Sequence, residues 1–296
     1  MISISAPAKI NLHLHITGRA ENGYHYLDSL IAFTNISDHI HISENSAYDL
    51  RIQGDPDIKS TLTANCPEDQ NLITRAAQLL AAQSGRAPNA LIHLEKHIPL
   101  GGGLGGGSSD AASVLQGLNR LWGLNLSLTD LHAIASQMGS DIAACLNAPG
   151  SVIMRDTGNT LCPSPKIPEL YSVLVNPRTP CPTPLVYKTY AAMQHPFSTP
   201  ILFPDFFADS LSVCSFLRTH TRNDLTDAAI RVNPDISRVL KALNSLPDQL
   251  LTRLSGSGST CYAIFTTKDQ AIKNQEFLLQ HHPDWWIKTT QIFANN

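Results

Sequence analysis

Six of the seven residues from Gly101 to Gly107 are glycine, in a chain of 296 residues that contains only 17 glycines. Before this run, apolar residues alternate at Ala90, Ile92 and Leu94, which predicts a strand. After it, apolar residues recur every three to four positions up to Leu121, which predicts a helix. The chain must therefore build a bare backbone loop between a strand and a helix.

A loop of this kind is typical of a phosphate-binding site. Its consecutive N–H groups point into one concavity, and the start of the following helix adds roughly half a positive charge. A side chain in the run would hold an anion away, so repeated glycine suits this use. The alternative is a flexible linker or a tight turn, but linkers usually mix glycine with serine over longer stretches. We therefore expect phosphate binding.

Two common classes of phosphate loop do not fit this run. The Walker pattern requires a lysine after its last glycine, and none follows Gly106 or Gly107. The dinucleotide pattern G-x-G-x-x-G is met by Gly101, Gly103 and Gly106, but this pattern is weak in any glycine-rich run. It would also need an acidic residue about 20 positions later at a strand end, where the sequence predicts the start of a helix.

Composition and charge limit the class of partner. The chain is 43% apolar and 15% charged, as soluble globular proteins are, and its net charge is −3. No run of lysine and arginine supplies a local basic patch, so we expect no nucleic-acid partner. The amino terminus does not resemble a secretory signal, and no apolar stretch of roughly 18 residues predicts a membrane span. We expect a cytoplasmic protein whose ligand is a small molecule.

The cysteines and histidines give no reason to expect a structural metal. The cysteines lie far apart, without CxxC pairs or zinc spacing, which predicts free thiols: Cys66, Cys145, Cys162, Cys181, Cys214 and Cys261. The pairs His13/His15 and His39/His41 follow the alternation of strands, and no acid or cysteine joins them in a ligand pattern.

The remaining pattern predicts an α+β protein with domains at residues 1–160 and 161–296. Alternation over residues 2–16 predicts two strands, and residues 72–82 predict a helix. The helix after the glycines has Ser108, Ser109 and Asp110 as capping candidates, and Ser127 with Asp130 predicts a capping box for a helix over 128–138. Seven prolines between residues 163 and 184 mark the entrance to the second domain, where strands and helices alternate.

Two segments resemble a known family. The segment PLGGGLGGGSSDAA (99–112) resembles the ATP loop of the GHMP kinases, the superfamily of galactokinase, homoserine kinase, mevalonate kinase and phosphomevalonate kinase. The segment PAKINLHLHITGRAENGYHYLDSL (7–30) is similar to the opening signature of the GHMP kinases that act on a cytidyl diphosphate-linked methylerythritol. The segments NLITRAAQLL, GSDIAACL, PTPLVY and LSGSGSTCYAIF follow in that family's order, so the resemblance covers nearly the whole chain.

The resemblance implies a fold and a reaction. The amino-terminal domain is expected to have a ribosomal-S5-domain-2-like fold and the carboxy-terminal domain a ferredoxin-like fold, with ATP and acceptor in a cleft closed by the turn Ser255–Ser259. The expected reaction uses ATP and Mg²⁺ to phosphorylate the 2-hydroxyl of the cytidyl-linked methylerythritol, in the non-mevalonate route to isoprenoid precursors. We expect a monomer or a weak homodimer.

Phosphoryl transfer to a hydroxyl requires charge compensation, in-line positioning and a group that orients the hydroxyl or accepts its proton. Asp141 is the candidate carboxylate, although from the residues alone it is equally a helix cap after Gly139. Lys9 on its own predicts a solvated charge at a strand edge. The resemblance implies instead that Lys9 and Asp141 form the catalytic pair, with Lys9 holding Asp141 ionised.

The predicted ATP-binding residues are those of the loop and two weaker candidates near the base. The loop residues are Pro99, Leu100, Gly101, Gly102, Gly103, Leu104, Gly105, Gly106, Gly107, Ser108 and Ser109. The weaker candidates are Asn71 and Lys96, and Lys96 could equally be an exposed charge at a strand end.

The resemblance also implies residues for the acceptor. Tyr24 and Tyr187 could sandwich a cytosine ring and His25 could read its edge, although tyrosines more often lie in cores or at rims. Asn11 and Thr183 are candidates for the diphosphate or the erythritol hydroxyls.

The sequence departs from the family at MRDTGN (154–159), where R-G-x-G-E is usual, and at Ala143, where proline is common. Two alternatives stay open: another GHMP kinase that acts on mevalonate, homoserine or a sugar, and a protein that binds ATP without catalysis. An oxidoreductase with a dinucleotide cofactor is a more distant alternative.

Overall fold

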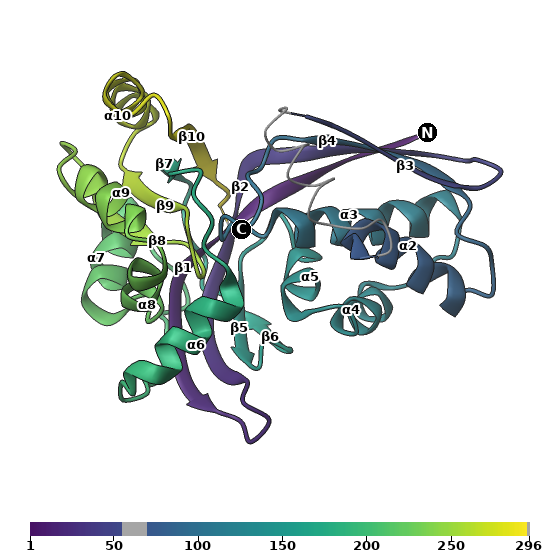
Figure 1. Ribbon diagram of the computed structural model, residues 1–296, viewed down its shortest axis with the longest axis horizontal. Coiled ribbons are helices and arrows are strands. Elements are labelled where there is room, and N and C mark those ends of the chain that lie inside the picture. The colour runs from purple at the N-terminus through teal and green to yellow at the C-terminus, as the bar shows by residue number, and fades with distance from the viewer. Residues whose placement is uncertain (55–69, 295–296) are drawn as a thin grey trace. The chain divides into compact units, whose positions relative to one another are not determined.

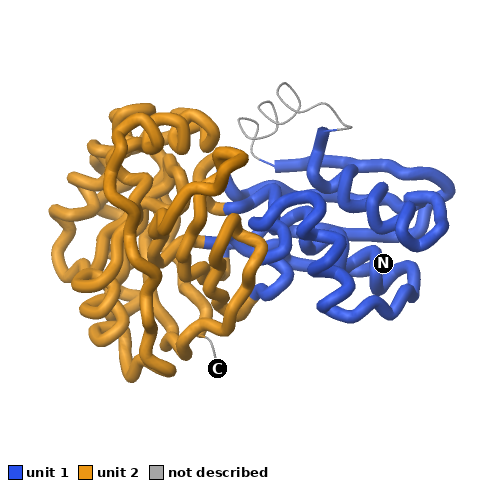
Figure 2. The backbone as a smooth tube through the Cα atoms, turned by 90° about the horizontal axis from the view of Figure 1, so that it is seen from below, with its two compact units in different colours: residues 1–9, 36–100, 105–148 blue, residues 10–35, 101–104, 149–296 orange. Residues whose placement is uncertain are grey.

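The computed structural model describes residues 1–54 and 70–294. The chain forms two compact units, coloured blue and orange in Figure 2. Unit 1 comprises residues 1–9, 36–100 and 105–148, and unit 2 comprises residues 10–35, 101–104 and 149–296. Both are discontinuous because the long strands β1 (Ile2–Arg19) and β2 (His25–Ser43) contribute residues to each. The division into domains at residues 1–160 and 161–296 stays a prediction.

In unit 1, strand β4 (Ala90–Lys96) lies between two partners. Strand β3 (Tyr48–Gly54) pairs with it in parallel, and the last part of β2 pairs with it antiparallel, with Ile42 opposite Ile92. Burial alternates along β4, as the sequence pattern predicts for a strand with one face on a core. The strand expected to lead into the glycines is therefore confirmed.

The helices of unit 1 cover one face of these strands (Figure 1). Within the described part of the unit they are α2 (Leu72–Gln83), α3 (Gly106–Leu121), α4 (Leu128–Ser136) and α5 (Ser140–Cys145). Helix α4 starts with the predicted capping box between Ser127 and Asp130. Helix α3 packs closely on the sheet because Gly117 has no side chain: a Cβ there would lie 2.5 Å from Cδ1 of Ile42.

Unit 2 contains an antiparallel sheet in the strand order β10-β7-β9-β8. The strands are β7 (Leu170–Asn176), β8 (Leu251–Leu254), β9 (Cys261–Phe265) and β10 (Trp286–Ile292). In chain order this is fourth, first, third, second, the arrangement of a ferredoxin-like sheet. The expected fold class is therefore confirmed.

Five helices of unit 2 accompany this sheet: α6 (Thr183–Met193), α7 (Ser210–His220), α8 (Thr226–Val232), α9 (Asp235–Asn244) and α10 (Lys268–His281). Their apolar residues share one core with strands β7 to β10. Val186 of α6 and Val239 of α9 are fully buried there, together with Phe265 of β9. Such a core holds the segments around Thr183 and Ser255 in fixed positions.

Strand β1 is one continuous strand, so the prediction of two strands over residues 2–16 is wrong. All residues from Ala6 to Ile16 are buried, because both faces of the strand are covered there. A strand that is buried on both faces does not need a polar face, so its hydrophobic alternation fails without a break in the strand. In unit 2, β2 also pairs with β5 (Val152–Asp156), which pairs with β6 (Thr160–Pro163).

Five of the six cysteines that are expected to be free thiols lie among the described residues. Cys145, Cys162, Cys181, Cys214 and Cys261 are free thiols, and Cys66 lies outside the described residues. No cluster of three or more potential metal-ligating side chains occurs within 1–54 and 70–294. In the same ranges, no helix has both the length and the apolar character needed to cross a membrane.

Candidate active site

The glycine loop connects the end of β4 to the start of α3. The helix begins at Gly106, and its N-cap residue is Gly105, whose φ of +63° is in the left-handed region that favours glycine. Among the described residues, no side chain caps this helix. The expectation that Ser108, Ser109 or Asp110 caps it is wrong, because the helix starts before them. The first N–H groups of α3 have no partner within the helix, so they can bind an anion.

The glycines of the loop serve two different purposes. At Gly103 and Gly105 the protein itself leaves no room: a Cβ would lie 2.2 Å from the carbonyl oxygen of Ser255 and 2.6 Å from Cγ of Lys9, respectively. At Gly101 no heavy atom of residues 1–54 and 70–294 lies within 4 Å of such a Cβ, and the φ of +60° alone favours glycine. Part of the run is therefore required by packing, and part leaves backbone accessible to a ligand.

Lys9 and Asp141 lie together in unit 1. The Lys9 Nζ atom is 3.5 Å from Oδ2 of Asp141, and the two side chains are 6% and 43% exposed. Lys9 comes from β1, and Asp141 lies in the first turn of α5. Because the stem of Lys9 also lies against Gly105, this ion pair is next to the start of α3. The carboxylate thus has a cation on one side and access to solvent on the other.

Lys96 is buried rather than exposed at the end of its strand. Its ammonium group donates to Asp38 and, over 2.6 Å, to Asp110, and its side chain is 1% exposed. Burial alone would lower the pKa of Lys96, but the two carboxylates outweigh it and raise that pKa. Lys96 is therefore a cation held by protein carboxylates. Sequence reasoning missed Asp38, because nothing in the residues around it indicates this pairing.

Asn71, the other candidate for the base, caps helix α2. Its Oδ1 atom accepts a hydrogen bond of 2.9 Å from the N–H of Ile73. The remaining loop residues Pro99 and Leu100 are partly buried, and Gly102 accepts a 3.0 Å hydrogen bond from the N–H of Thr260. An ATP contact for these residues stays a prediction.

The candidate acceptor residues all belong to unit 2. The rings of His25 and Tyr187 lie 5.4 Å apart between centroids and are tilted by 36°, and Tyr190 contacts the same histidine. Tyr24 is 68% exposed and has no part in the ring contacts of the described residues. The structure thus brings His25 to Tyr187, but it does not bring Tyr24 to either of them.

Asn11 and Thr183 both contact the SGSGS turn or its neighbours. The Asn11 side-chain amide donates to Oγ of Ser29 over 2.8 Å, and its backbone N–H donates to Oγ of Ser255 over 3.3 Å. The Thr183 hydroxyl lies 2.7 Å from that of Ser257. Ser255 in turn donates to the carbonyl oxygen of Gly103 over 2.8 Å. Within unit 2, this turn therefore links Asn11 to the middle of the glycine loop.

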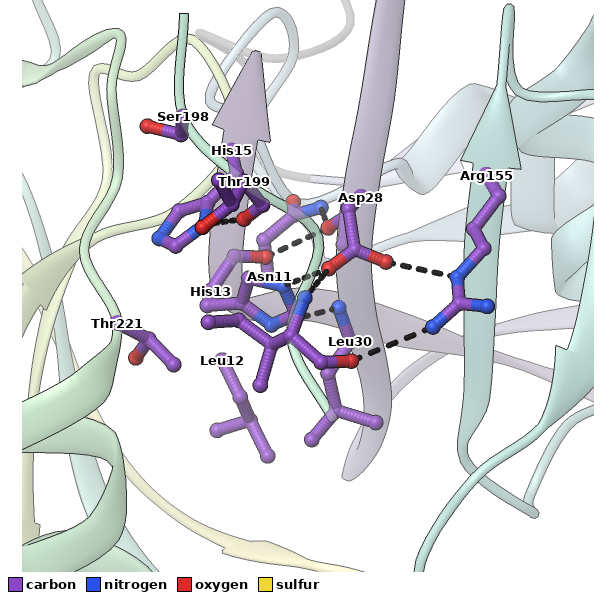
Figure 3. Close-up of polar contacts among 12 residues, drawn as sticks. Asn11, Leu12, His13, His15, Asp28, Leu30, Arg155, Ser198, Thr199 and Thr221 are labelled. Atoms are coloured by element: carbon purple, nitrogen blue, oxygen red, sulfur yellow. Dashed lines mark hydrogen bonds and ion pairs between the residues drawn. The ribbon is translucent and has the colours of Figure 1, made fainter. Parts of the chain in front are cut away.

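A buried polar cluster lies next to Asn11 (Figure 3). From the sequence, its histidine is interpreted only as part of the polar face of a strand. His13 Nε2 lies 3.3 Å from Asp28, and His13 Nδ1 accepts the N–H of Leu30. Asp28 also accepts from Nε of Arg155 over 2.9 Å and from the N–H of Ile201 over 2.7 Å. These bonds fasten the segment around Ile201 to β1 and β2, so the histidine is structural.

Comparison with known proteins identifies the family. Residues 71–149 match the GHMP kinases N terminal domain, and residues 209–284 match the GHMP kinases C terminal domain. The 4-diphosphocytidyl-2-C-methyl-D-erythritol kinase of Paramagnetospirillum magneticum is 39% identical over 294 residues, which cover 99% of each chain. The chain belongs to this family of GHMP kinases.

Other members of the 4-diphosphocytidyl-2-C-methyl-D-erythritol kinase family agree with this assignment. The enzyme of Caulobacter vibrioides is 38% identical and aligns with 98% of this chain and 99% of its own. A crystal structure of 4-(cytidine 5'-diphospho)-2C-methyl-D-erythritol kinase superposes with a TM-score of 0.75 at 30% identity, covering 98% of this chain and 99% of that one. A crystal structure of L. major mevalonate kinase in complex with R-mevalonate shares the fold at 13% identity and a TM-score of 0.72, covering 99% of this chain and 96% of that one.

Proposed function

We propose that this protein transfers the γ-phosphoryl group of ATP to the 2-hydroxyl of 4-diphosphocytidyl-2-C-methyl-D-erythritol. The single observation that carries the proposal is the Lys9–Asp141 ion pair at the start of α3, in a member of this kinase family. A lysine-paired carboxylate beside free helix amides supplies an acid–base group and an anion site in one place.

On the ATP side, the amides at the start of α3 bind the phosphates. The loop carries no cation of its own, so backbone N–H groups and the helix dipole provide the electrostatic stabilisation. At Gly101 and Gly107 a Cβ would meet nothing closer than 3.7 Å, which leaves the backbone there accessible to phosphate oxygens. Removing positive partial charge from this loop therefore reduces the stabilisation of the transition state and the affinity for ATP.

Mg²⁺ would enter with ATP and neutralise phosphate charge as it does in other phosphoryl-transfer enzymes. The hydroxyl of Ser109 fits a ligand for such an ion, since it is buried without a hydrogen-bond partner among the described residues. Ser108 is a second hydroxyl in the same turn. With so few protein oxygens available, the ATP phosphates and water must supply most of the ligands.

At the acceptor hydroxyl, Asp141 is the reacting carboxylate. The ammonium of Lys9 stabilises the ionised form of Asp141, so that the carboxylate can accept a hydrogen bond from the hydroxyl. Asp141 then either removes the proton as the phosphoryl group is transferred or orients the hydroxyl for in-line attack. In both cases the charge on Asp141 and its position relative to the loop determine the rate.

In unit 2, the acceptor is held by residues that suit its parts. His25 and Tyr187 present a ring pair for the cytosine, and Tyr24 offers a further exposed ring. Asn11 and Thr183 carry amide and hydroxyl groups for the diphosphate and the polyol. A cytoplasmic location and a monomeric or weakly dimeric state stay predictions from the sequence.

The proposal is tested by measuring ADP release with a panel of acceptors. We expect ADP with the cytidyl-linked methylerythritol and none above background with mevalonate, homoserine or galactose. Asp141→Asn should abolish turnover, because the amide cannot accept the proton or carry the charge, while ATP still binds. Turnover with a different acceptor would replace the proposed substrate, and ATP binding without turnover of any acceptor would refute catalysis.

A further inference from the structure

A buried ion cluster contacts the two ends of the glycine loop in unit 1, and the mechanism above does not use it. It consists of Lys96 at the end of β4, Asp38 on β2 and Asp110 in α3. The ammonium of Lys96 contacts both carboxylates, and the side chains of Lys96, Asp38 and Asp110 are 1%, 0% and 3% exposed. Burial raises the pKa of Asp110 above its usual range against the opposing effect of Lys96, and Oδ1 of Asp110 has no hydrogen-bond partner among the described residues. The cluster is therefore held together by the contacts of Lys96 with both acidic side chains, and these contacts link the backbone segments that carry them.

Asp38 binds the entry of the loop directly. Its Oδ1 atom accepts hydrogen bonds from the backbone N–H groups of His97 and Ile98, the second of them over 2.9 Å. These two residues are the first after β4, where the chain leaves the sheet. One carboxylate thus supplies partners for the amides that the strand no longer pairs.

Through its other oxygen, Asp38 reaches the exit of the loop. Its Oδ2 atom accepts from Lys96, and Lys96 donates to Oδ2 of Asp110 in the first part of α3. A Cβ on Gly106, the first residue of that helix, would lie 3.0 Å from Nζ of Lys96 and 3.0 Å from Cγ2 of Ile98. The ammonium therefore lies directly beneath the start of the helix.

These contacts join the two ends of the loop to each other. Residues 97 and 98 at its entry and residues 106 to 110 at its exit are joined through one carboxylate and one ammonium. A phosphate site made of backbone amides has no side chains that could adjust to a displaced ligand, so its precision depends on whatever holds the two ends.

We infer that Asp38, acting through Lys96 and Asp110, is a positioning residue that sets the spacing of the phosphate-binding amides. This inference rests on the proposed binding of ATP at the loop and does not depend on which acceptor is phosphorylated. It assigns Lys96 an indirect role: Lys96 holds the loop rather than the nucleotide.

The test compares ATP with adenosine, because adenosine lacks the phosphates that the loop would hold. Dissociation constants for both are measured by titration calorimetry on wild type, Asp38→Asn and Asp110→Asn. In each variant we expect ATP affinity to fall roughly 10- to 100-fold, as expected for a site displaced by about 1 Å, with adenosine affinity unchanged. The ratio of the two affinities is a readout that a general loss of stability does not move.

Asp28→Asn is the matched control. Asp28 is a carboxylate that is 1% exposed and ion-paired with Arg155, but it lies in unit 2, and its hydrogen bonds among the described residues go to His13, Arg155 and Ile201 rather than to the loop. It should lower the unfolding temperature without changing the ratio of ATP to adenosine affinity. A shift of that ratio in Asp28→Asn equal to the shift in Asp38→Asn would overturn the inference, because the effect would then be nonspecific.

An unchanged ratio in folded Asp38→Asn and Asp110→Asn would also overturn it, as would an equal loss of ATP and adenosine binding. If Asp38→Asn does not fold, Asp110→Asn keeps the Asp38–Lys96 pair and provides the same comparison. Hydrogen exchange on the wild type needs no variant: the amides of His97 and Ile98 should be protected without ATP, and exchange at the rate of exposed amides would refute the contacts that join the two ends of the loop.

Failure of the proposed function would look different. A wild type that binds ATP more tightly than adenosine but phosphorylates another acceptor refutes the proposed substrate and supports the role of the loop. A wild type that shows no preference for ATP over adenosine refutes phosphate binding at the loop and this inference with it.

Discussion

At the scale of single residues, Lys9 shows how one side chain can serve two neighbours. Its stem fills the space that a side chain on Gly105 would need, and its ammonium reaches Asp141. A lysine that is 6% exposed loses rotamer freedom and hydration, so it needs a compensating partner. Asp141 provides that partner and remains accessible to a substrate hydroxyl.

We therefore expect Lys9→Met to lower kcat by roughly 10²- to 10⁴-fold while the dissociation constant of ATP changes little. Methionine keeps the apolar stem against Gly105 but removes the charge that stabilises the Asp141 carboxylate. The measurement is steady-state ADP release together with ATP titration. Lys273→Met, an exposed lysine on α10, is the control and should behave as wild type. A kcat within about twofold of wild type in Lys9→Met would exclude a catalytic role for the ion pair.

At the scale of elements, the decisive feature is how α3 begins. Most helices start at a residue whose side chain accepts a backbone N–H. Helix α3 begins at Gly106 after the N-cap residue Gly105, and no side chain of the described residues caps it. In the same unit α2 and α4 are capped by Asn71 and Ser127, and the short helix α5 resembles α3 in having a glycine N-cap without a side-chain cap. An uncapped start costs stability, which is consistent with amides that are kept for a ligand.

Gly105→Ala tests this helix start. The residue would have to hold a φ of +63° and its Cβ would lie 2.6 Å from Cγ of Lys9, so we expect displacement of Lys9 and a large loss of kcat. Gly85→Ala is a matched control, because Gly85 has a φ of +65° after α2 but nothing within 4 Å of its Cβ. That control should lose about 1–2 kcal/mol of stability and keep its activity. Equal kcat values in the two variants would contradict the packing argument.

At the scale of the whole molecule, buried polar residues link stability to pH. His13 is fully buried, and burial lowers its pKa below 6.5 against the opposing effect of Asp28. Asp28 has its pKa lowered from 3.8 to about 2: burial alone would raise it, but hydrogen bonds from His13, Ile201 and Arg155 outweigh burial. In the folded protein at neutral pH, His13 is uncharged and Asp28 is ionised.

The sign of the pH dependence follows from the proton count. Below pH 6.5 the unfolded chain binds a proton at His13 more readily than the folded chain does, so the free energy of unfolding falls as pH falls. The contribution of Asp28 is present above pH 3.8 and is lost as pH falls toward about 2. We expect urea unfolding, followed by the fluorescence of the buried Trp285 and Trp286 in unit 2, to show decreasing stability from pH 7 to pH 5.

The control for this prediction is His13→Gln, which cannot titrate in that range. It should reduce the slope of stability against pH between pH 7 and 5 by up to about 1.4 kcal/mol per pH unit, the value for one proton. A slope identical to that of wild type would show that His13 does not contribute to the pH dependence of stability.

The sequence by itself determined the features that depend on local chemistry. The alternation in β4, the capping box of α4 and the run of glycines each depend on neighbours within a few residues, because backbone conformation and periodic burial are local properties. The resemblance of the loop and of the segment around Lys9 to a kinase family added the pairing of Lys9 with Asp141, residues 132 positions apart, which local pattern alone could not provide.

Only the tertiary structure decided which charges are buried and what each glycine is for. The sequence around Lys96 is compatible with an exposed charge at a strand end. In the structure, Lys96 is buried against Asp38 and Asp110, and these partners come from two other elements. Gly103 and Gly105 read alike, but one is required by Ser255 and the other by Lys9. The physical reason is the same in both cases: burial and steric contact depend on segments that are distant in sequence, and no pattern within one segment encodes its partners.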